Sequence, residues 1–133
     1  MHIEITLTDA CNMRCKYCFE HDHTNKSNPI EEARQLDLIN NACIDFDTTK
    51  FKELQIVFWG GEPILNMAFM RKIIETTNKY AFVNYFMYSN GTLIDNYQEF
   101  VNDKLMQSVK NRFKIQISYD GEPINTLERG IDG

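Results

Sequence analysis

The sequence predicts an α/β fold, a partial (βα) barrel of about four parallel strands with three helices on the outer face. Segments with strand character alternate with segments of helical periodicity, which is typical of βαβ units and a parallel sheet. The strand segments alternate apolar and polar residues, which favours helices on only one face of the sheet. A chain of 133 residues holds only half of an eight-stranded βα barrel, and we expect residues 1–133 to form one truncated domain.

Four segments show the alternation and the β-branched and aromatic residues of strands. They are residues 2–8, 53–59, 82–89 and 112–119. One face of these strands is apolar and should carry the helices, with Ile3, Ile5, Leu7, Leu54, Ile56, Phe58, Phe113, Ile115 and Ile117. The other face is polar, with Glu4, Thr6, Gln55, Lys114, Gln116 and Ser118. A polar face suits the inner wall of an incomplete barrel that holds water or a ligand, and it suits equally a two-layer sheet with one solvated face.

Three segments between the strands have helical periodicity. They are residues 27–46, 66–80 and 93–109. The first begins with Asn28 at the N-cap, Pro29 at the first helical position and Glu31 in a capping-box arrangement. The apolar stripes of the three helices are Ala33, Leu36, Ile39 and Cys43; Met67, Met70, Ile73 and Ile74; and Ile94, Tyr97, Val101 and Leu105. We expect Cys43 and Trp59 to be core residues, and residues 120–133 are not assigned to a helix.

Charge and hydropathy argue against several classes of protein. A net charge of −5 disfavours binding to nucleic acid or to an anionic membrane. No apolar run approaches the roughly 20 residues that a membrane span needs, and the N-terminal residues lack the basic and apolar regions of a signal peptide. We therefore expect a cytoplasmic location, where thiols stay reduced and clustered cysteines more often bind metal than form disulfides.

Three of the four cysteines, Cys11, Cys15 and Cys18, lie within eight positions. Thiolates with the spacing C-x₃-C-x₂-C can ligate three irons of a [4Fe–4S] cluster and leave the fourth iron open to another ligand. The competing interpretation is zinc, with His21 as the fourth ligand. Thiol redox chemistry through Cys15 and Cys18 is a third interpretation, but it leaves Cys11 without a role.

Each expected strand runs into a loop with unusual residues. The four loops are Cys11–Cys18, GGEP at 60–63, SNGT at 89–92 and SYDG at 118–121. Because ligands of parallel sheets bind at the carboxyl ends of the strands, the convergence of these loops predicts a site there. Gly60 and Gly61 allow the backbone to approach a ligand closely, and Pro63 rigidifies the turn that carries Glu62. An ordinary strand-to-helix turn explains the same residues.

Together, CNMRCKYCF, GGEP, SNGT and ISYDG resemble the radical S-adenosylmethionine (SAM) superfamily in their order, spacing and placement after strands. The resemblance is to the N-terminal half of the family's core domain and covers about residues 3–121. It is closest to the branch of anaerobic sulfatase-maturating enzymes and peptide maturases. The resemblance implies that Cys11, Cys15 and Cys18 ligate a [4Fe–4S] cluster and that SAM binds beside it.

The resemblance also implies roles for residues around SAM. Tyr17 fills the aromatic position of the cysteine motif, where backbone groups meet the adenine, and Phe19 would pack beside it. Ser89 and Asn90 match the polar pair of the third strand, and Ser118 matches the serine of the fourth strand, near the SAM ribose in relatives.

The glycine-rich turn has an implied role of its own. Gly60, Gly61, Glu62 and Pro63 match the turn that holds the methionyl ammonium, and carbonyls with a carboxylate suit such a cation. Asp120 belongs to the motif after the fourth strand, although an ordinary Asp-Gly turn explains it equally well. No residue is assigned as a catalytic acid or base.

The implied activity is that of a radical SAM enzyme or its catalytic half. In this family SAM chelates the open iron, and a low-potential electron then cleaves SAM. The resulting 5′-deoxyadenosyl radical abstracts hydrogen from the substrate, which is expected here to be a peptide or protein. The implied partners are a reductant such as flavodoxin or ferredoxin and a second copy or a completing chain. Two alternatives stay open: a truncated fragment that binds cluster and SAM without turnover, and a zinc-binding interaction module that uses His21.

Overall fold

A computed structural model of the chain contains a four-stranded parallel sheet covered by helices. It describes residues 1–18, 28–119, 121 and 129–131. The sheet contains β1 (His2–Thr6), β3 (Leu54–Trp59), β4 (Val83–Ser89) and β5 (Phe113–Ile117). The helices are α1 (Pro29–Asp47), α2 (Met67–Thr77), α3 (Ile94–Asn102) and α4 (Lys104–Val109), with 3₁₀ turns η1 (Pro63–Asn66) and η2 (Lys110–Arg112). A separate antiparallel pair joins β2 (Met13–Cys15) to β6 (Arg129–Ile131).

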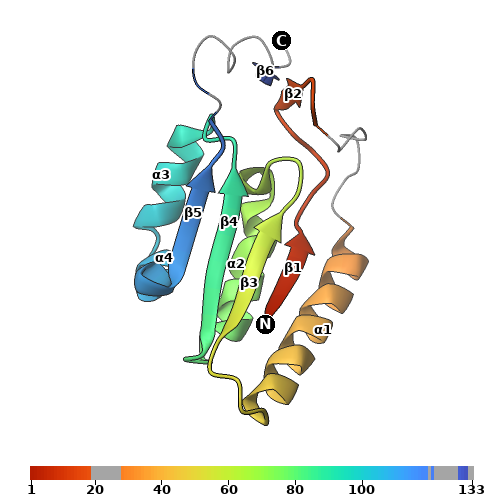
Figure 1. The fold of residues 1–133 in the computed structure, drawn as a ribbon, viewed down its shortest axis with the longest axis vertical. Coiled ribbons are helices and arrows are strands. Elements are labelled where there is room, and N and C mark those ends of the chain that lie inside the picture. The colour runs from red at the N-terminus through yellow and green to blue at the C-terminus, as the bar shows by residue number, and fades with distance from the viewer. Residues whose placement is uncertain (19–27, 120, 122–128, 132–133) are drawn as a thin grey trace.

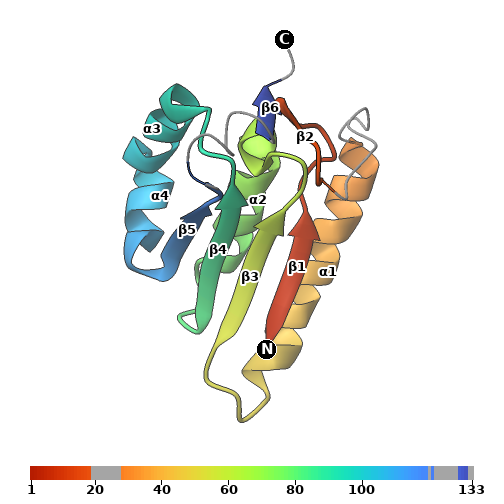
Figure 2. The ribbon, with the colours of Figure 1, turned by 45° about the horizontal axis from the view of Figure 1, so that its top comes forward.

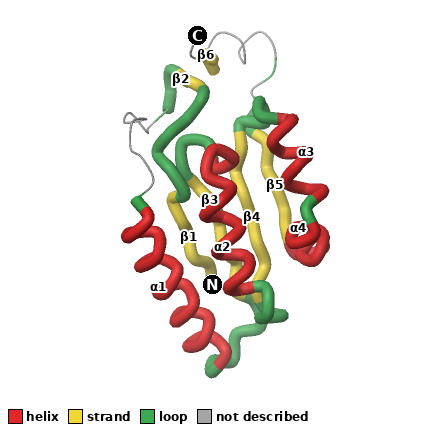
Figure 3. The backbone as a smooth tube through the Cα atoms, turned by 180° about the vertical axis from the view of Figure 1, so that it is seen from behind, coloured by secondary structure: helices red, strands yellow, loops and turns green. Residues whose placement is uncertain are grey.

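The strands of the sheet follow one another in chain order, β1-β3-β4-β5, and every neighbouring pair is parallel. All four carboxyl ends therefore lie along one edge, at the top of Figure 1. The view from behind shows the helices in front of the sheet, so that they cover a single face (Figure 3). The predicted α/β architecture of a partial barrel, with helices on the outer face, is confirmed. None of the described helices is long and apolar enough to cross a membrane.

The core lies between the sheet and the helices, on the strand face that the alternation predicts. Its fully or nearly fully buried residues on the strands, with Leu7 directly after β1, are Ile5, Leu7, Leu54, Ile56, Phe58, Val83, Tyr85 and Met87. On the opposite face the expected polar residues Glu4, Thr6, Gln55, Lys114 and Gln116 are exposed. Ile117 departs from the expectation because it is 51% exposed, at the end of the edge strand β5.

The predicted helices differ from the observed ones in detail. Asn28 caps α1 as expected, accepting from the Ile30 backbone N–H at 3.0 Å, and Pro29 is its first residue. Ala33 is exposed, however, and the buried stripe of α1 consists of Ile39, Cys43 and Phe46. In the third predicted helix, the side chains of Ile94 and Tyr97 lie outside the described part of the structure.

The third predicted helix, residues 93–109, is divided into α3 and α4 at Asp103. Asp103 has extended backbone angles, φ −66° and ψ 143°, and its carboxylate caps α4 by accepting from the Leu105 backbone N–H at 2.8 Å. The same carboxylate pairs with Arg71 of α2, with 2.6 Å between Nη1 and Oδ2. A capping side chain with a cationic partner thus stabilises the break that helical periodicity does not reveal.

The pairing of β2 with β6 was not predicted. Cys15 lies opposite Arg129 and Met13 opposite Ile131, so residues near the C-terminal end of the chain border the cysteine loop. Figure 2 shows the two short strands side by side beyond the carboxyl edge of the sheet.

Candidate functional site

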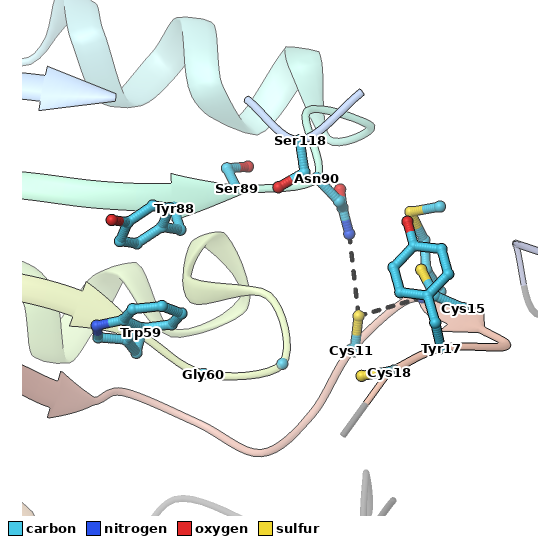
Figure 4. A pocket seen from close by; sticks show the side chains of 12 residues that line it. Cys11, Cys15, Tyr17, Cys18, Trp59, Gly60, Tyr88, Ser89, Asn90 and Ser118 are labelled. Carbon is cyan, nitrogen blue, oxygen red and sulfur yellow. Dashed lines mark hydrogen bonds between the residues drawn. The ribbon is translucent and has the colours of Figure 1, made fainter. Parts of the chain in front are cut away.

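A cavity of about 210 Å³ lies at the carboxyl edge of the sheet, where the sequence predicts a site. It is lined by Cys11, Met13, Cys15, Tyr17, Cys18, Trp59, Gly60, Gly61, Tyr88, Ser89, Asn90 and Ser118. Figure 4 shows these side chains converging from the cysteine loop and from the ends of β3, β4 and β5. The structure therefore brings nine of the predicted site residues to one cavity; Phe19 and Asp120 lie outside the described residues.

The cysteine loop presents three half-buried cysteine side chains to this cavity. The backbone N–H of Cys18 donates to the Cys15 carbonyl at 3.1 Å, which closes a turn, and the backbone N–H of Met13 points to Cys11 Sγ at 3.4 Å. In the described part of the chain, no group of three or more Cys, His, Asp or Glu is placed to hold a metal ion, and His21 is outside that part. A single ion needs all of its ligands around one point, whereas each thiolate of a [4Fe–4S] cluster binds a different iron. Three thiols around one cavity, with an N–H donor directed at one sulfur, therefore fit an iron–sulfur cluster better than a single ion.

The two glycines allow the turn after β3 to pack on the segment that leads to Cys11. Gly60 has φ +148°, and a Cβ on it would lie 2.3 Å from the Thr8 carbonyl oxygen. A Cβ on Gly61 would lie 2.3 Å from the carbonyl oxygen of Ala10. Real Cβ atoms do not approach so closely, so any larger residue displaces the cysteine loop. The two glycines were predicted to allow a close approach to a ligand. They line the cavity, and they also allow a close approach to the chain's own backbone.

Glu62 holds two of the loops together. Only 1% of its surface is exposed, and its Oε1 accepts from the Ser89 hydroxyl at 2.8 Å and from the Ile64 backbone N–H at 3.3 Å. Its Oε2 accepts from the Asn90 backbone N–H at 2.8 Å. Neither Glu62 nor Pro63, the first residue of η1, is among the residues that line the cavity.

The serines at the ends of β4 and β5 differ in what their hydroxyls are free to bind. The Ser89 hydroxyl donates to Glu62 and accepts from the Gly91 backbone N–H at 3.1 Å. Ser118 is joined to β4 by its backbone N–H, which donates to the Ser89 carbonyl at 2.9 Å. Its hydroxyl lines the cavity and makes no hydrogen bond with the described residues. Ser118 is therefore the serine that can bind a ligand hydroxyl without losing an existing bond.

The Asn90 side chain is fully occupied by the protein. Its Nδ2 donates to Asn12 Oδ1 at 2.9 Å and lies 3.9 Å from Cys11 Sγ. Its Oδ1 accepts from both the backbone N–H and the hydroxyl of Thr92, at 3.0 and 2.8 Å. A primary amide has two N–H donors and two acceptor lone pairs, and these four contacts use all of them.

An aromatic pair, which was not predicted from the sequence, forms one wall of the cavity. Trp59 and Tyr88 have ring centroids 4.3 Å apart with an interplanar angle of 31°, and both line the cavity. Trp59 was expected in the core. Both residues occupy strand positions of opposite parity to Phe58 and Met87, which face the helices, so the alternation itself carried the signal. The Trp59 Nε1 atom is buried without a hydrogen-bond partner among the described residues.

Comparisons with known proteins agree with this geometry. The sequence matches the family model described as "Radical SAM superfamily" over residues 5–121. It is 31% identical over 132 residues to an uncharacterized protein of Methanocaldococcus jannaschii, covering 96% of this chain and 41% of the relative. It is 28% identical over 130 residues to a cysteine-type anaerobic sulfatase-maturating enzyme of Clostridium perfringens, covering 92% and 33%. A GTP 3′,8-cyclase of Microcystis aeruginosa is 25% identical over 134 residues, covering 98% and 37%.

The fold is similar to that of a solved structure described as native anSMEcpe with bound AdoMet and Cp18Cys peptide. The TM-score is 0.65 at 24% identity, over 97% of this chain and 33% of the other. This chain therefore spans about a third to two fifths of the length of the proteins it matches. Because the family model matches residues 5–121, which include the cysteine loop, the glycine turn and the strand ends, the chain belongs to the radical SAM superfamily.

Proposed function

We propose that this chain binds a [4Fe–4S] cluster through Cys11, Cys15 and Cys18, binds SAM in the adjoining cavity, and provides the radical-generating part of an enzyme. The observation that carries the proposal is that one cavity is bordered by three thiols, by the glycine turn and by the polar ends of two strands. When bound, the cluster and SAM supply a radical that abstracts hydrogen from a substrate.

The protein's own contribution is to position these groups. The glycine turn seats the cysteine loop, since it leaves no room for side chains against the carbonyls of Thr8 and Ala10. The free Ser118 hydroxyl is suited to a ribose hydroxyl, and Tyr17, which is 55% exposed, lies at the same cavity. The packed rings of Trp59 and Tyr88 form an apolar wall, which reduces the access of water.

Glu62 supports a cationic ligand near the turn. Its buried carboxylate is held by neutral donors from Ile64, Ser89 and Asn90, and it forms no salt bridge with the described residues. Neutral donors stabilise a carboxylate without cancelling its charge, so the field extends into the neighbouring cavity, where a methionyl ammonium would be favoured.

The proposed substrate is a peptide or protein. The Clostridium perfringens relative is named for maturing a sulfatase, which is itself a protein. The cyclase relative is named for GTP, so a nucleotide is the substrate class that would replace this part of the proposal. We further propose a flavodoxin or ferredoxin as reductant, a second copy or a completing chain at the open side of the barrel, and a cytoplasmic location.

Anaerobic reconstitution with iron and sulfide tests the proposal. We expect about four irons per site, as in a [4Fe–4S] cluster, and release of 5′-deoxyadenosine after dithionite and SAM are added. Cys15→Ala should abolish uptake at this site, whereas Cys43→Ala, which changes a fully buried residue of α1, should retain it. Stoichiometric zinc without cluster uptake would contradict the proposal, and a cluster without SAM cleavage would favour a binding fragment.

A further inference from the structure

We propose that Asn90 is a positioning residue that raises the reduction potential of the cluster site by donating a hydrogen bond to the sulfur of Cys11. The inference rests on the proposed function, because it requires Cys11 to be a cluster ligand. It assigns the Asn90 side chain to the cysteine loop and leaves the ribose to Ser118, in contrast to the role that the resemblance implies for Asn90.

Two N–H groups from different parts of the chain are directed at the Cys11 sulfur. The Met13 backbone N–H approaches it at 3.4 Å from within the loop, and the Asn90 amide approaches at 3.9 Å from the end of β4 (Figure 4). The longer contact is weak for a neutral thiol. A metal-bound thiolate is a stronger acceptor, because charge-assisted hydrogen bonds are shorter and about twice as strong as neutral ones.

The direction of the Asn90 amide is determined by its other partners. Thr92 donates two hydrogen bonds to Oδ1, from its backbone N–H and its hydroxyl, so this atom must be the acceptor. The Nδ2 atom consequently faces Asn12 Oδ1 and Cys11 Sγ, where a donor is required. Exchanging the two amide atoms would place an NH₂ group against the Thr92 N–H and an oxygen against Asn12 Oδ1.

Contacts of the Asn90 backbone and of the neighbouring Asn12 side chain also fix the position of Asn90. Its backbone N–H donates to the buried carboxylate of Glu62 at 2.8 Å. Asn12 closes a ring of contacts because its Nδ2 donates to the Thr92 hydroxyl at 2.7 Å while its Oδ1 accepts from Asn90. The donor to the sulfur is therefore oriented before any cluster binds, and the cysteine loop is joined to the β4 loop at this point.

Hydrogen bonds to cluster sulfurs are one of the factors that set the reduction potential. Reduction adds an electron to the cluster, and an N–H donor stabilises the more negative reduced state more than the oxidised state. Loss of the Asn90 donor should therefore lower the potential. At the wild-type midpoint, we expect the ratio of oxidised to reduced cluster to rise about fivefold, which is ~40 mV at 59 mV per decade for one electron.

The test compares the reconstituted wild-type protein with its Asn90→Ala and Asn90→Asp variants in an anaerobic redox titration that is followed by electron paramagnetic resonance. Loss of a signal in Cys15→Ala identifies which cluster belongs to this site. Asn96→Ala and Asn96→Asp are matched controls, since Asn96 is an exposed residue of α3. We expect a lower potential in both Asn90 variants, with a larger shift for the charged one, and no shift in the controls.

A second readout separates hydrogen bonding from general damage. The iron–thiolate stretching frequencies in resonance Raman spectra should change in the Asn90 variants and stay unchanged in the Asn96 variants. Wild-type potentials and spectra in both Asn90 variants would overturn this inference and leave the proposed function in place. Variants that assemble no cluster would overturn it too, in favour of a purely structural role. Failure of the wild-type protein to take up a cluster would overturn the proposed function itself.

Discussion

Replacing Glu62 by glutamine tests whether this residue joins the loops of the site. The buried carboxylate accepts from three groups, the Ser89 hydroxyl and the backbone N–H groups of Ile64 and Asn90. Glutamine has nearly the same shape but offers one oxygen and one NH₂ group. If the oxygen takes the place of Oε1, the NH₂ group faces the Asn90 N–H, and two donors oppose each other.

The expected cost follows from that count. A hydrogen bond to a charged group contributes about 1.5–3 kcal/mol, and a buried group left without a partner costs ~1–3 kcal/mol. The substitution sets two donors against each other at one of the three contacts, and it turns the other two from hydrogen bonds to a charged acceptor into hydrogen bonds to a neutral one. We therefore expect a loss of about 2–3 kcal/mol in the free energy of unfolding. For a small domain with a urea m value of ~2 kcal/mol/M, the unfolding midpoint should fall by about 1–1.5 M.

The assay is urea denaturation followed by the fluorescence of Trp59, the single tryptophan, which lines the cavity beside the turn. Glu99→Gln makes the same chemical change on the exposed surface of α3 and should alter stability by less than about 0.5 kcal/mol. Equal midpoints for Glu62→Gln and Glu99→Gln would refute the assignment of Glu62 as the residue that joins the turn to β4.

Three further predictions concern packing, pH dependence and ligand binding. Gly61→Ala should reduce both stability and cluster uptake, because its Cβ would lie 2.3 Å from a backbone oxygen of the cysteine loop. Gly121→Ala, with φ +81° and nothing within 4 Å, should retain cluster uptake, as measured by iron content. The hydrogen bond from Arg71 lowers the pKa of Asp103 below its ordinary 3.8, so its stabilisation is present above that value and is lost as pH falls through the lowered pKa. Asp103→Asn should therefore lower the urea midpoint of unfolding at pH 7 relative to wild type, and this difference should shrink below about pH 4. A difference that stays constant with pH would show that the pair of Arg71 and Asp103 does not stabilise the fold. Ser118→Ala should weaken SAM binding in calorimetry without lowering iron content, and unchanged affinity would remove Ser118 from the site.

The order of strands and helices and the location of the site could be read from local patterns. Period-two alternation identified the face of each strand that packs on helices, as Ile56 and Phe58 show by being fully buried. Parallel strands place their carboxyl ends along one edge, and so the cysteine loop and the glycine turn had to lie near each other. The same alternation placed Trp59 on the open face, although its residue type suggested the core.

Contacts between distant parts of the chain were beyond such patterns. Asn90 and Cys11 are 79 positions apart, and nothing in their local sequence indicates that an amide faces a sulfur. The sequence predicts Glu62 to be a ligand-binding carboxylate. In the structure it accepts hydrogen bonds from Ser89 and Asn90 at the end of β4, 27 and 28 positions later in the chain. Residue type and spacing restrict which groups reach one edge of the sheet. Which donor meets which acceptor there depends on how the separate loops pack, because hydrogen bonds require both distance and direction to be satisfied together.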